Sequence, residues 1–174
     1  VAAVTTTDSP GVVTYSTSSA ATICLVNTST GAATIKGVGD CVVNATVAGT
    51  TYYLTKSTVA TLRILKAAQA AFTLTNASST NFMQTVTVAS AGGSGTGAVS
   101  YRVEASSTCQ LFGTTLVVGD AGSLCAITAT KAGDANYEPI TTAVMNVTVN
   151  KISQAALNLV NVSTIEVGTF DLVT

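Results

Sequence analysis

The sequence contains no histidine and no tryptophan, and only 9% of its 174 residues are charged. Without histidine, a serine or cysteine nucleophile would lack its usual general base, so we expect no triad-type hydrolase. Seven basic and eight acidic residues leave a net charge of −1, which provides no electrostatic basis for binding nucleic acid or an anionic membrane. We therefore expect neither an enzyme nor a nucleic-acid-binding protein, and no cofactor.

Long apolar runs are also missing. No stretch approaches the ~18 uncharged apolar residues that a membrane-spanning helix requires, so we do not expect a membrane-embedded protein. The sequence shows no initiator methionine, signal peptide or wall-anchoring tail, and we expect either a processed chain or a section of a longer one. Aromatic residues make up 5% of a chain that is 47% hydrophobic, and the abundant Val, Ala and Thr favour strands.

Apolar and polar residues alternate in many short segments, as in Val13–Tyr15, Cys41–Val47 and Val99–Val103. This period of two is typical of half-buried strands and argues against a disordered, low-complexity chain. Turn residues recur about every ten positions, which favours a sandwich or barrel. The expected strands cover residues 13–16, 23–26, 34–38, 41–47, 58–66, 71–75, 85–89, 99–103, 115–118, 125–130 and 142–150.

The chain repeats itself. The segment Cys41–Asn76 aligns with Cys125–Asn161, with an offset of 84 positions at the cysteines and 85 at the ends. A fixed period of this kind indicates a repeat array. We expect three parts: a repeat lacking its first strands at residues 1–65, a complete repeat at 66–150, and the opening strands of another repeat at 151–174.

The junctions between repeats are short. Lys66 and Gln69 follow one strand directly, and Lys151 and Gln154 follow its counterpart, with no Gly- or Ser-rich linker. Short connections restrict hinge motion, so we expect neighbouring units to stack end to end as a stiff rod.

The last segment, residues 151–174, corresponds to the opening strands that the first unit, residues 1–65, lacks. Either the chain is a section of a continuous array, or residues 151–174 of one chain complete residues 1–65 of a neighbour by strand addition. A sandwich without its first strands exposes an unpaired edge. Both alternatives predict a head-to-tail contact with copies of the chain or adjacent repeats, which propagates into a filament or rod.

The four cysteines occupy matching places in the two repeats. Cys24 and Cys41 are 17 positions apart (41 − 24), and Cys109 and Cys125 are 16 apart (125 − 109). Four cysteines allow three pairings, and the repeat selects one disulfide in each unit. A tetrahedral metal site is the rival interpretation, but the sequence offers no histidine and no CxxC motif. Disulfides indicate an oxidising, extracellular setting.

Three strings in the second half resemble bacterial immunoglobulin-like repeats, the tandem modules of long surface proteins and adhesins. They are GGSGTGAVSYRV, GTTLVVGDAGSLCAITATKAGDANYEP and VTVNKISQAALNL. The resemblance implies an all-β fold of tandem immunoglobulin-like antiparallel β-sandwiches of Greek-key type, arranged head to tail. It also implies a structural role outside the cell or at the cell surface. The first unit differs in two loops, with TTTDSPG and VAGTTYYL at the corresponding places.

A few residues invite functional interpretations. Asp120, Asp134 and Glu138 are weak candidates for a calcium site, but their first-unit counterparts are uncharged or absent, which favours turn capping by Asp134 and Asn136. The other expected structural positions are the turn glycines and corner tyrosines, whose hydroxyls would bond the main chain: Gly49, Tyr53, Gly133 and Tyr137.

Other chemistry is weakly indicated. The GGSGTGA loop lacks the lysine and helix of a phosphate-binding loop. An isopeptide bond would need a partner for Lys36 or Lys131, and none is evident. N-x-S/T motifs leave glycosylation open; they begin at Asn27, Asn44, Asn76, Asn146 and Asn161.

The leading hypothesis from the sequence is a structural segment of an extracellular bacterial filament, stalk or surface protein. The alternative is an adhesin module that binds glycan or a host protein through the loops at the sandwich ends. Binding loops usually carry exposed aromatic or charged residues, whereas these loops are rich in Gly, Ser, Thr and Ala. A virion decoration module is a more remote alternative.

Overall fold

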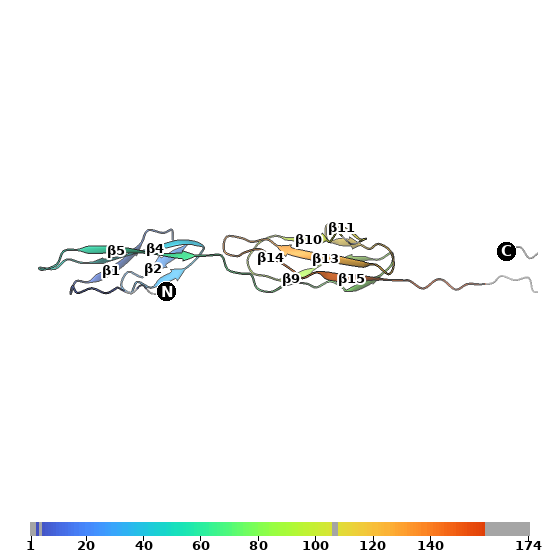
Figure 1. Cartoon of the computed structure of the whole chain (residues 1–174), viewed down its shortest axis with the longest axis horizontal. Helices are drawn as coiled ribbons and strands as arrows, with labels where there is room; N and C mark the ends of the chain where they lie inside the picture. Colours follow the sequence, from blue (N-terminus) through green and yellow to red (C-terminus); the bar gives the residue numbers. More distant parts are fainter. Residues whose placement is uncertain (1–2, 4, 106–107, 159–174) are drawn as a thin grey trace, which may run out of the picture.

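The computed structural model describes residues 3, 5–105 and 108–158, and within these ranges it contains strands and loops but no helix. Two groups of strands follow one another along the long axis of the molecule (Figure 1). We call the group up to residue 65 the first unit and residues 66–150 the second unit. No helix in the described ranges has the length and hydropathy to cross a membrane.

The strands of the first unit are β1 (Val13–Thr17), β2 (Cys24–Val26), β3 (Ala33–Ile35), β4 (Gly39–Val47) and β5 (Lys56–Ile64). Those of the second unit are β6 (Phe72–Leu74), β7 (Ser79–Asn81), β8 (Thr85–Thr87), β9 (Ser90–Gly92), β10 (Val99–Val103), β11 (Gln110–Phe112), β12 (Thr115–Val117), β13 (Leu124–Lys131), β14 (Ile140–Thr141) and β15 (Met145–Asn150).

The second unit is a sandwich of two layers. One layer has the order β10-β13-β15-β7, with β14 beside β13, and the other contains β11-β12-β8 together with the β6-β9 pair. Neighbouring strands are antiparallel except β7 and β15, which are parallel. The first strand of the unit thus divides into β6 on one layer and β7 on the other. This order, with β8, β9, β11 and β12 opposite β10, β13 and β15, is that of an immunoglobulin domain.

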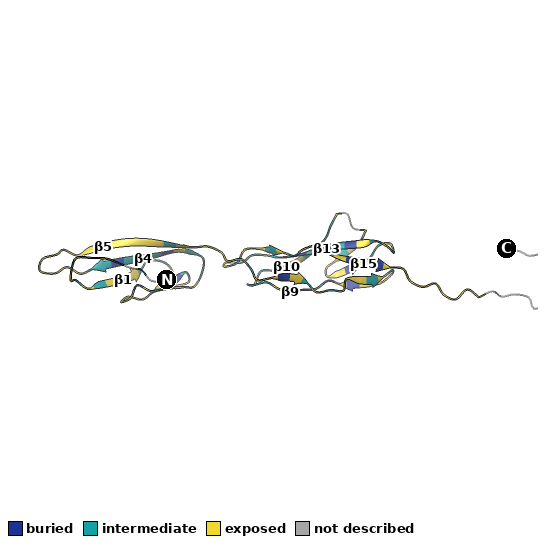
Figure 2. Cartoon of the chain, turned by 60° about the horizontal axis from the view of Figure 1, so that its bottom comes forward, coloured by how far each residue is buried: buried dark blue, intermediate teal, exposed yellow. Residues whose placement is uncertain are grey.

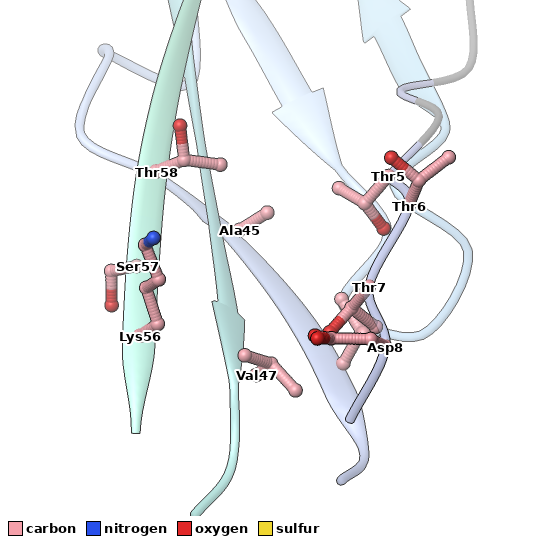
Figure 3. A pocket seen from close by; sticks show the side chains of 10 residues that line it. Thr5, Thr6, Thr7, Asp8, Ala45, Val47, Lys56, Ser57 and Thr58 are labelled. Atoms are coloured by element: carbon pink, nitrogen blue, oxygen red, sulfur yellow. The ribbon is translucent and has the colours of Figure 1, made fainter. Parts of the chain in front are cut away.

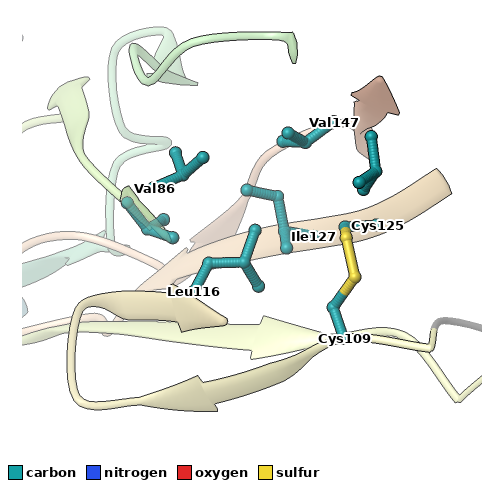
Figure 4. Close-up of a cluster of buried hydrophobic side chains, with 8 residues drawn as sticks. Val86, Cys109, Leu116, Cys125, Ile127 and Val147 are labelled. Atoms are coloured by element: carbon teal, nitrogen blue, oxygen red, sulfur yellow. A yellow bond between two sulfur atoms is a disulfide. The ribbon is translucent and has the colours of Figure 1, made fainter. Parts of the chain in front are cut away.

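Alternation along the central strand builds the core. In β13 every second side chain from Cys125 to Ala129 is buried. These side chains meet residues of the other layer (Figure 4). The fully enclosed members include Leu116 from β12 and Val147 from β15. Burying a side chain of this size stabilises the fold by about 1.5–3 kcal/mol relative to leaving it exposed.

The first unit repeats part of this plan. Its sheets are β1-β4-β5, equivalent to β10-β13-β15, and β2-β3, equivalent to β11-β12. Cys24, Cys41 and Val43 form its buried cluster. Ala33 pairs with Val26 as Leu116 pairs with Leu111, so a small residue replaces a large, fully buried core residue of the second unit.

The beginning of the chain replaces one further strand. The Ala3 amide donates to the Gly31 carbonyl at 3.2 Å, as the Val88 amide donates to that of Thr114 at 2.8 Å. Thr5 bonds the hydroxyl of Tyr15 at 3.0 Å. In the second unit, Ser90 bonds the hydroxyl of Tyr101 at the same distance. Residues from Thr5 onward therefore follow the path of β9, and the described part of the first unit has no counterpart of β6 or β7.

Each of the eleven expected strands overlaps a strand of the structure, but β7, β9, β11 and β14 were not predicted. The strand predicted at 58–66 is β5, which begins and ends two residues earlier. The one predicted at 142–150 is β15, which begins three residues later, at Met145, and β14 lies before the predicted range. Our reading of Asn76–Thr80 as a turn was wrong in part, because β7 begins at Ser79. Main-chain bonds to β15 hold this polar strand, so it carries no apolar signal.

Candidate functional site

The feature most closely tied to the repeat is the junction between the units. Lys66 and Ala67 leave β5 and run directly onto the 134–138 loop of the second unit. The Ala67 amide donates to the Asn136 carbonyl at 2.8 Å, and the Glu138 amide donates to the Ala67 carbonyl at 2.9 Å. These two bonds form a parallel bridge opposite Tyr137, so the chain is fixed within two residues of the junction.

Gln69 fixes the same segment through its side chain. Its Nε2 donates to the main-chain carbonyls of Glu138 at 2.8 Å, Ala132 at 3.1 Å and Lys131 at 3.4 Å. The amide has two N–H donors to share among these three carbonyls, and a net gain of about 0.5–1.5 kcal/mol is usual for each full bond. One amide thus ties the entering strand to both sides of the 132–138 loop.

The two units also contact each other directly. The Val38 amide of the first unit donates to Asn136 Oδ1 of the second at 3.2 Å. Beside this bond is a groove of about 270 Å³ whose walls include Ile35, Ile64 and Tyr137. The hydrogen bond across the junction opposes bending between the units.

The other predicted junction residues are exposed. Lys66 points to solvent, as do Lys151 and Gln154 at the far end of the second unit. Lys151 and Gln154 follow β15 as Lys66 and Gln69 follow β5, so the same Lys and Gln spacing stands where the chain enters and where it leaves the second unit.

The turn at Gly133 and Asp134 supports the junction loop. Asp134 Oδ1 accepts hydrogen bonds from the amides of Asn136 at 2.9 Å and Tyr137 at 3.0 Å. Its Oδ2 accepts from the Thr96 amide at 2.7 Å. The Thr96 amide is the largest cause, and the Asn136 amide the next, of a pKa of Asp134 below its ordinary value. Asp134 is thus a turn cap and also holds the glycine loop 92–97.

The first unit builds the same turn without a charge. Thr50 Oγ1 accepts hydrogen bonds from the Tyr52 and Tyr53 amides at 3.3 and 3.2 Å. The Thr50 amide donates to the Tyr53 carbonyl. The Asp134 amide makes the equivalent bond to Tyr137. In both units the turn therefore depends on the main chain of the tyrosine, and Gly49 and Gly133 precede the capping residue.

The weak calcium candidates do not come together. Asp120 precedes β13, whereas Asp134 and Glu138 follow it, so the eight-residue strand, about 26 Å long, separates them. In the described ranges no three His, Cys, Asp or Glu side chains are placed as a metal site. The Asp120 carbonyl instead accepts bonds from the Ser123 amide and hydroxyl.

The cysteines form the two disulfides that the repeat indicates. Cys24 is bonded to Cys41 with a Cα–Cα distance of 5.9 Å, and Cys109 to Cys125 with 5.7 Å. Both bridges are buried in the core of their own unit. Disulfides of this kind are typical of proteins in oxidising, extracellular compartments.

Sequence reasoning overlooked two contributors. Asn136 was expected to cap a turn, and its side chain instead reaches the other unit. The tyrosine hydroxyls that bond across a sandwich are those of Tyr15 and Tyr101. Their equivalence was visible in the repeat, but their partners Thr5 and Ser90 lie in segments too short and too variable to align with confidence from sequence.

Comparisons with known proteins yield structural neighbours only. A scan against protein-family models found no match, and neither did a search of curated proteins. Among solved structures, Drosophila N-cadherin EC1-4 is similar at a TM-score of 0.39 and 11% identity over 87% of this chain and 44% of that chain.

Mouse cadherin-23 EC22-24 is similar at a TM-score of 0.35 and 12% identity, over 81% of this chain and 53% of that chain. The S-layer protein rSbsC is similar at a TM-score of 0.29 and 18% identity, over 79% of this chain and 20% of that chain. The chain thus spans about half or less of each of these proteins.

Proposed function

We propose that this chain is a structural repeat segment of a long extracellular filament, stalk or surface protein of bacterial type, with units stacked head to tail. The observation that carries the proposal is the junction. The main-chain bridge at Ala67 ties the connecting chain to the second unit directly after β5, and the Val38–Asn136 bond crosses between the units. The same Lys and Gln positions recur at the far end.

The chemistry of the side chains supports a structural role more than a catalytic one. The sequence contains no histidine, and all four cysteines are bonded in disulfides. One disulfide per unit stabilises a sandwich that has few large core residues, by about 3 kcal/mol in the chain-entropy model. Covalent bridges suit a protein that must stay folded outside the cell.

Electron microscopy with an antibody raised against the second unit tests this function. The expected result on native material is label distributed along thin, continuous rods or stalks that project from cells. Pre-immune serum on the same grids is the control. Label found solely on dispersed single molecules of the length of this chain would contradict the proposal.

A further inference from the structure

A groove in the first unit lies open along the sandwich. It has a volume of about 280 Å³ and lies between the segment Thr5–Asp8 and the beginning of β5 at Lys56–Thr58. Ala45 and Val47 of β4 form part of its floor (Figure 3). The long face of β5 beside it is exposed (Figure 2).

The second unit shows what fills the equivalent space. There β6 pairs with β9, in the register Phe72 with Gly92 and Leu74 with Ser90, and it also contacts β13. Phe72 is 6% exposed. Ala129, four residues after the bridging cysteine as Ala45 is in the first unit, is 1% exposed against 8% for Ala45. The groove of the first unit therefore lies at the place that β6 occupies in the second unit.

The described end of the chain carries a second copy of the β6 sequence. Residues 151–157 read KISQAAL, where residues 66–72 read KAAQAAF, so Leu157 corresponds to Phe72. Leu157 is 100% exposed. This segment leaves the second unit on the side away from the first unit (Figure 1), so a chain cannot place it in its own groove.

We propose that residues 151–158 of a second copy of this chain fill the groove, pairing with Thr5–Thr7 as β6 pairs with β9 and placing Leu157 over Ala45. Gln154 then faces the carbonyls of Val47 and Ala48, as Gln69 faces those of Lys131 and Ala132. Each copy thereby completes the next. The inference rests on the proposed structural function and specifies how its units join.

Sedimentation velocity of the purified chain over a wide range of concentrations tests the proposal. We expect a concentration-dependent ladder of elongated oligomers. Leu157→Asp removes the donor side chain, and Thr6→Pro removes an amide from the acceptor edge; each variant alone should remain monomeric. Leu54→Asp replaces a leucine that is 93% exposed outside the groove, and this control should assemble as the unmodified chain does.

Mixing the two monomeric variants provides the decisive arm. The Leu157→Asp chain keeps an intact groove and the Thr6→Pro chain keeps an intact donor, so the mixture should form dimers and nothing longer. Hydrogen exchange in that dimer should slow at residues 5–8 of one chain and 154–158 of the other. Circular dichroism of each separate variant is the folding control. A Thr6→Pro chain that has misfolded would give a spectrum that differs from that of the unmodified chain.

Three results would overturn the inference: an unmodified chain that is monomeric throughout, assembly that survives Leu157→Asp, or a variant mixture without dimers. None of these touches the structural function itself, because in a longer polypeptide a preceding repeat can supply the strand. Conversely, label on dispersed single molecules in the microscope would contradict the function while leaving the pairing measured in solution intact.

Discussion

At the scale of single residues, Gly97 marks a place where two strands approach too closely for a side chain. A Cβ atom at this position would be 1.8 Å from the carbonyl oxygen of Ala132. Gly11 stands in the same relation to Ala48 in the first unit, at 2.1 Å. Since main-chain atoms cannot rotate away as a side chain does, both glycines are required by space.

We predict that Gly97→Ala lowers the free energy of unfolding of the second unit by about 3 kcal/mol, the upper end of the usual cost of over-packing, since the backbone must shift to accept the methyl group. Gly113→Ala is the control. Gly113 has a positive φ of 61° but no atoms near the added carbon, so it loses only the roughly 1–2 kcal/mol of a left-handed residue. Urea denaturation monitored by circular dichroism measures both. Equal losses of unfolding free energy in the two variants would contradict the prediction, because they would show that the backbone at Gly97 moves aside without cost.

Asp134 gives the second unit a response to acid. The amides of Thr96 and Asn136 hold its pKa below the ordinary value of 3.8. A lowered pKa in the folded state means that the stabilisation is complete above the unfolded value and is lost as the pH falls through the folded value. Because the carboxylate is exposed, water screens the effect, and we expect local loosening rather than unfolding.

We predict that amide exchange of Thr96 and Tyr137, corrected for the intrinsic pH dependence, accelerates on acidification below about pH 4. Nuclear magnetic resonance measures it residue by residue. The Tyr53 amide, bonded to the uncharged Thr50, is the internal control and should show no such change. Asp134→Asn should abolish the pH dependence. If Thr96 remains equally protected in acid, the carboxylate does not hold the glycine loop.

At the scale of elements, the disulfides belong to separate sandwiches. Cys109→Ser combined with Cys125→Ser should lower the free energy of unfolding of the second unit by about 3 kcal/mol, as expected for opening a loop of this length. Differential scanning calorimetry should show one transition moving and the other unchanged. The pair Cys24→Ser and Cys41→Ser should give the converse pattern. Both transitions moving together would mean that the two units unfold as one.

Sequence reasoning recovered the elements whose side chains alternate between core and solvent. Cys41–Val47 and Cys125–Thr130 were recognised because every second residue is buried, and the disulfides followed from their place in the repeat. The strand β7 was missed because Ser79 and its neighbours are polar and are held by main-chain bonds to β15. Periodicity reports burial, so an edge strand that buries little has no pattern to detect.

The junction was predicted only in outline. Lys66 and Gln69 were singled out because they recur, yet recurrence could not show that Gln69 binds carbonyls of the 132–138 loop. The hydrogen bond of Asn136 to the first unit could not be predicted from the repeat. The counterpart of Asn136 in the first unit lies at the end away from the second unit and makes no such contact in the described residues. Contacts between repeats depend on the neighbour, and an alignment of one repeat with itself does not contain them.

At the scale of the whole molecule, the short junction determines how far the units can bend. We predict that inserting two glycines between Leu65 and Lys66 broadens the distribution of intramolecular distances in small-angle X-ray scattering, since flexible residues uncouple the units. The same insertion between Thr51 and Tyr52, in an exposed loop of the first unit, is the control and should leave the distribution narrow. A broad distribution in the unmodified chain would show that the junction contacts do not restrain bending.

The parallel pairing of β7 with β15 has a mechanical consequence. Tension along a rod enters the second unit near Lys66 and leaves near Asn150, so it pulls β7 and β15 in opposite directions along their length. Ser79–Asn81 and Thr148–Asn150 are then loaded in shear, and their bonds must break together rather than one by one. Even after rupture, the Cys109–Cys125 bridge closes a loop with a sequence separation of 16, about 55 Å of chain, that cannot extend. The second unit would thus yield in a limited step and keep part of its core closed under load.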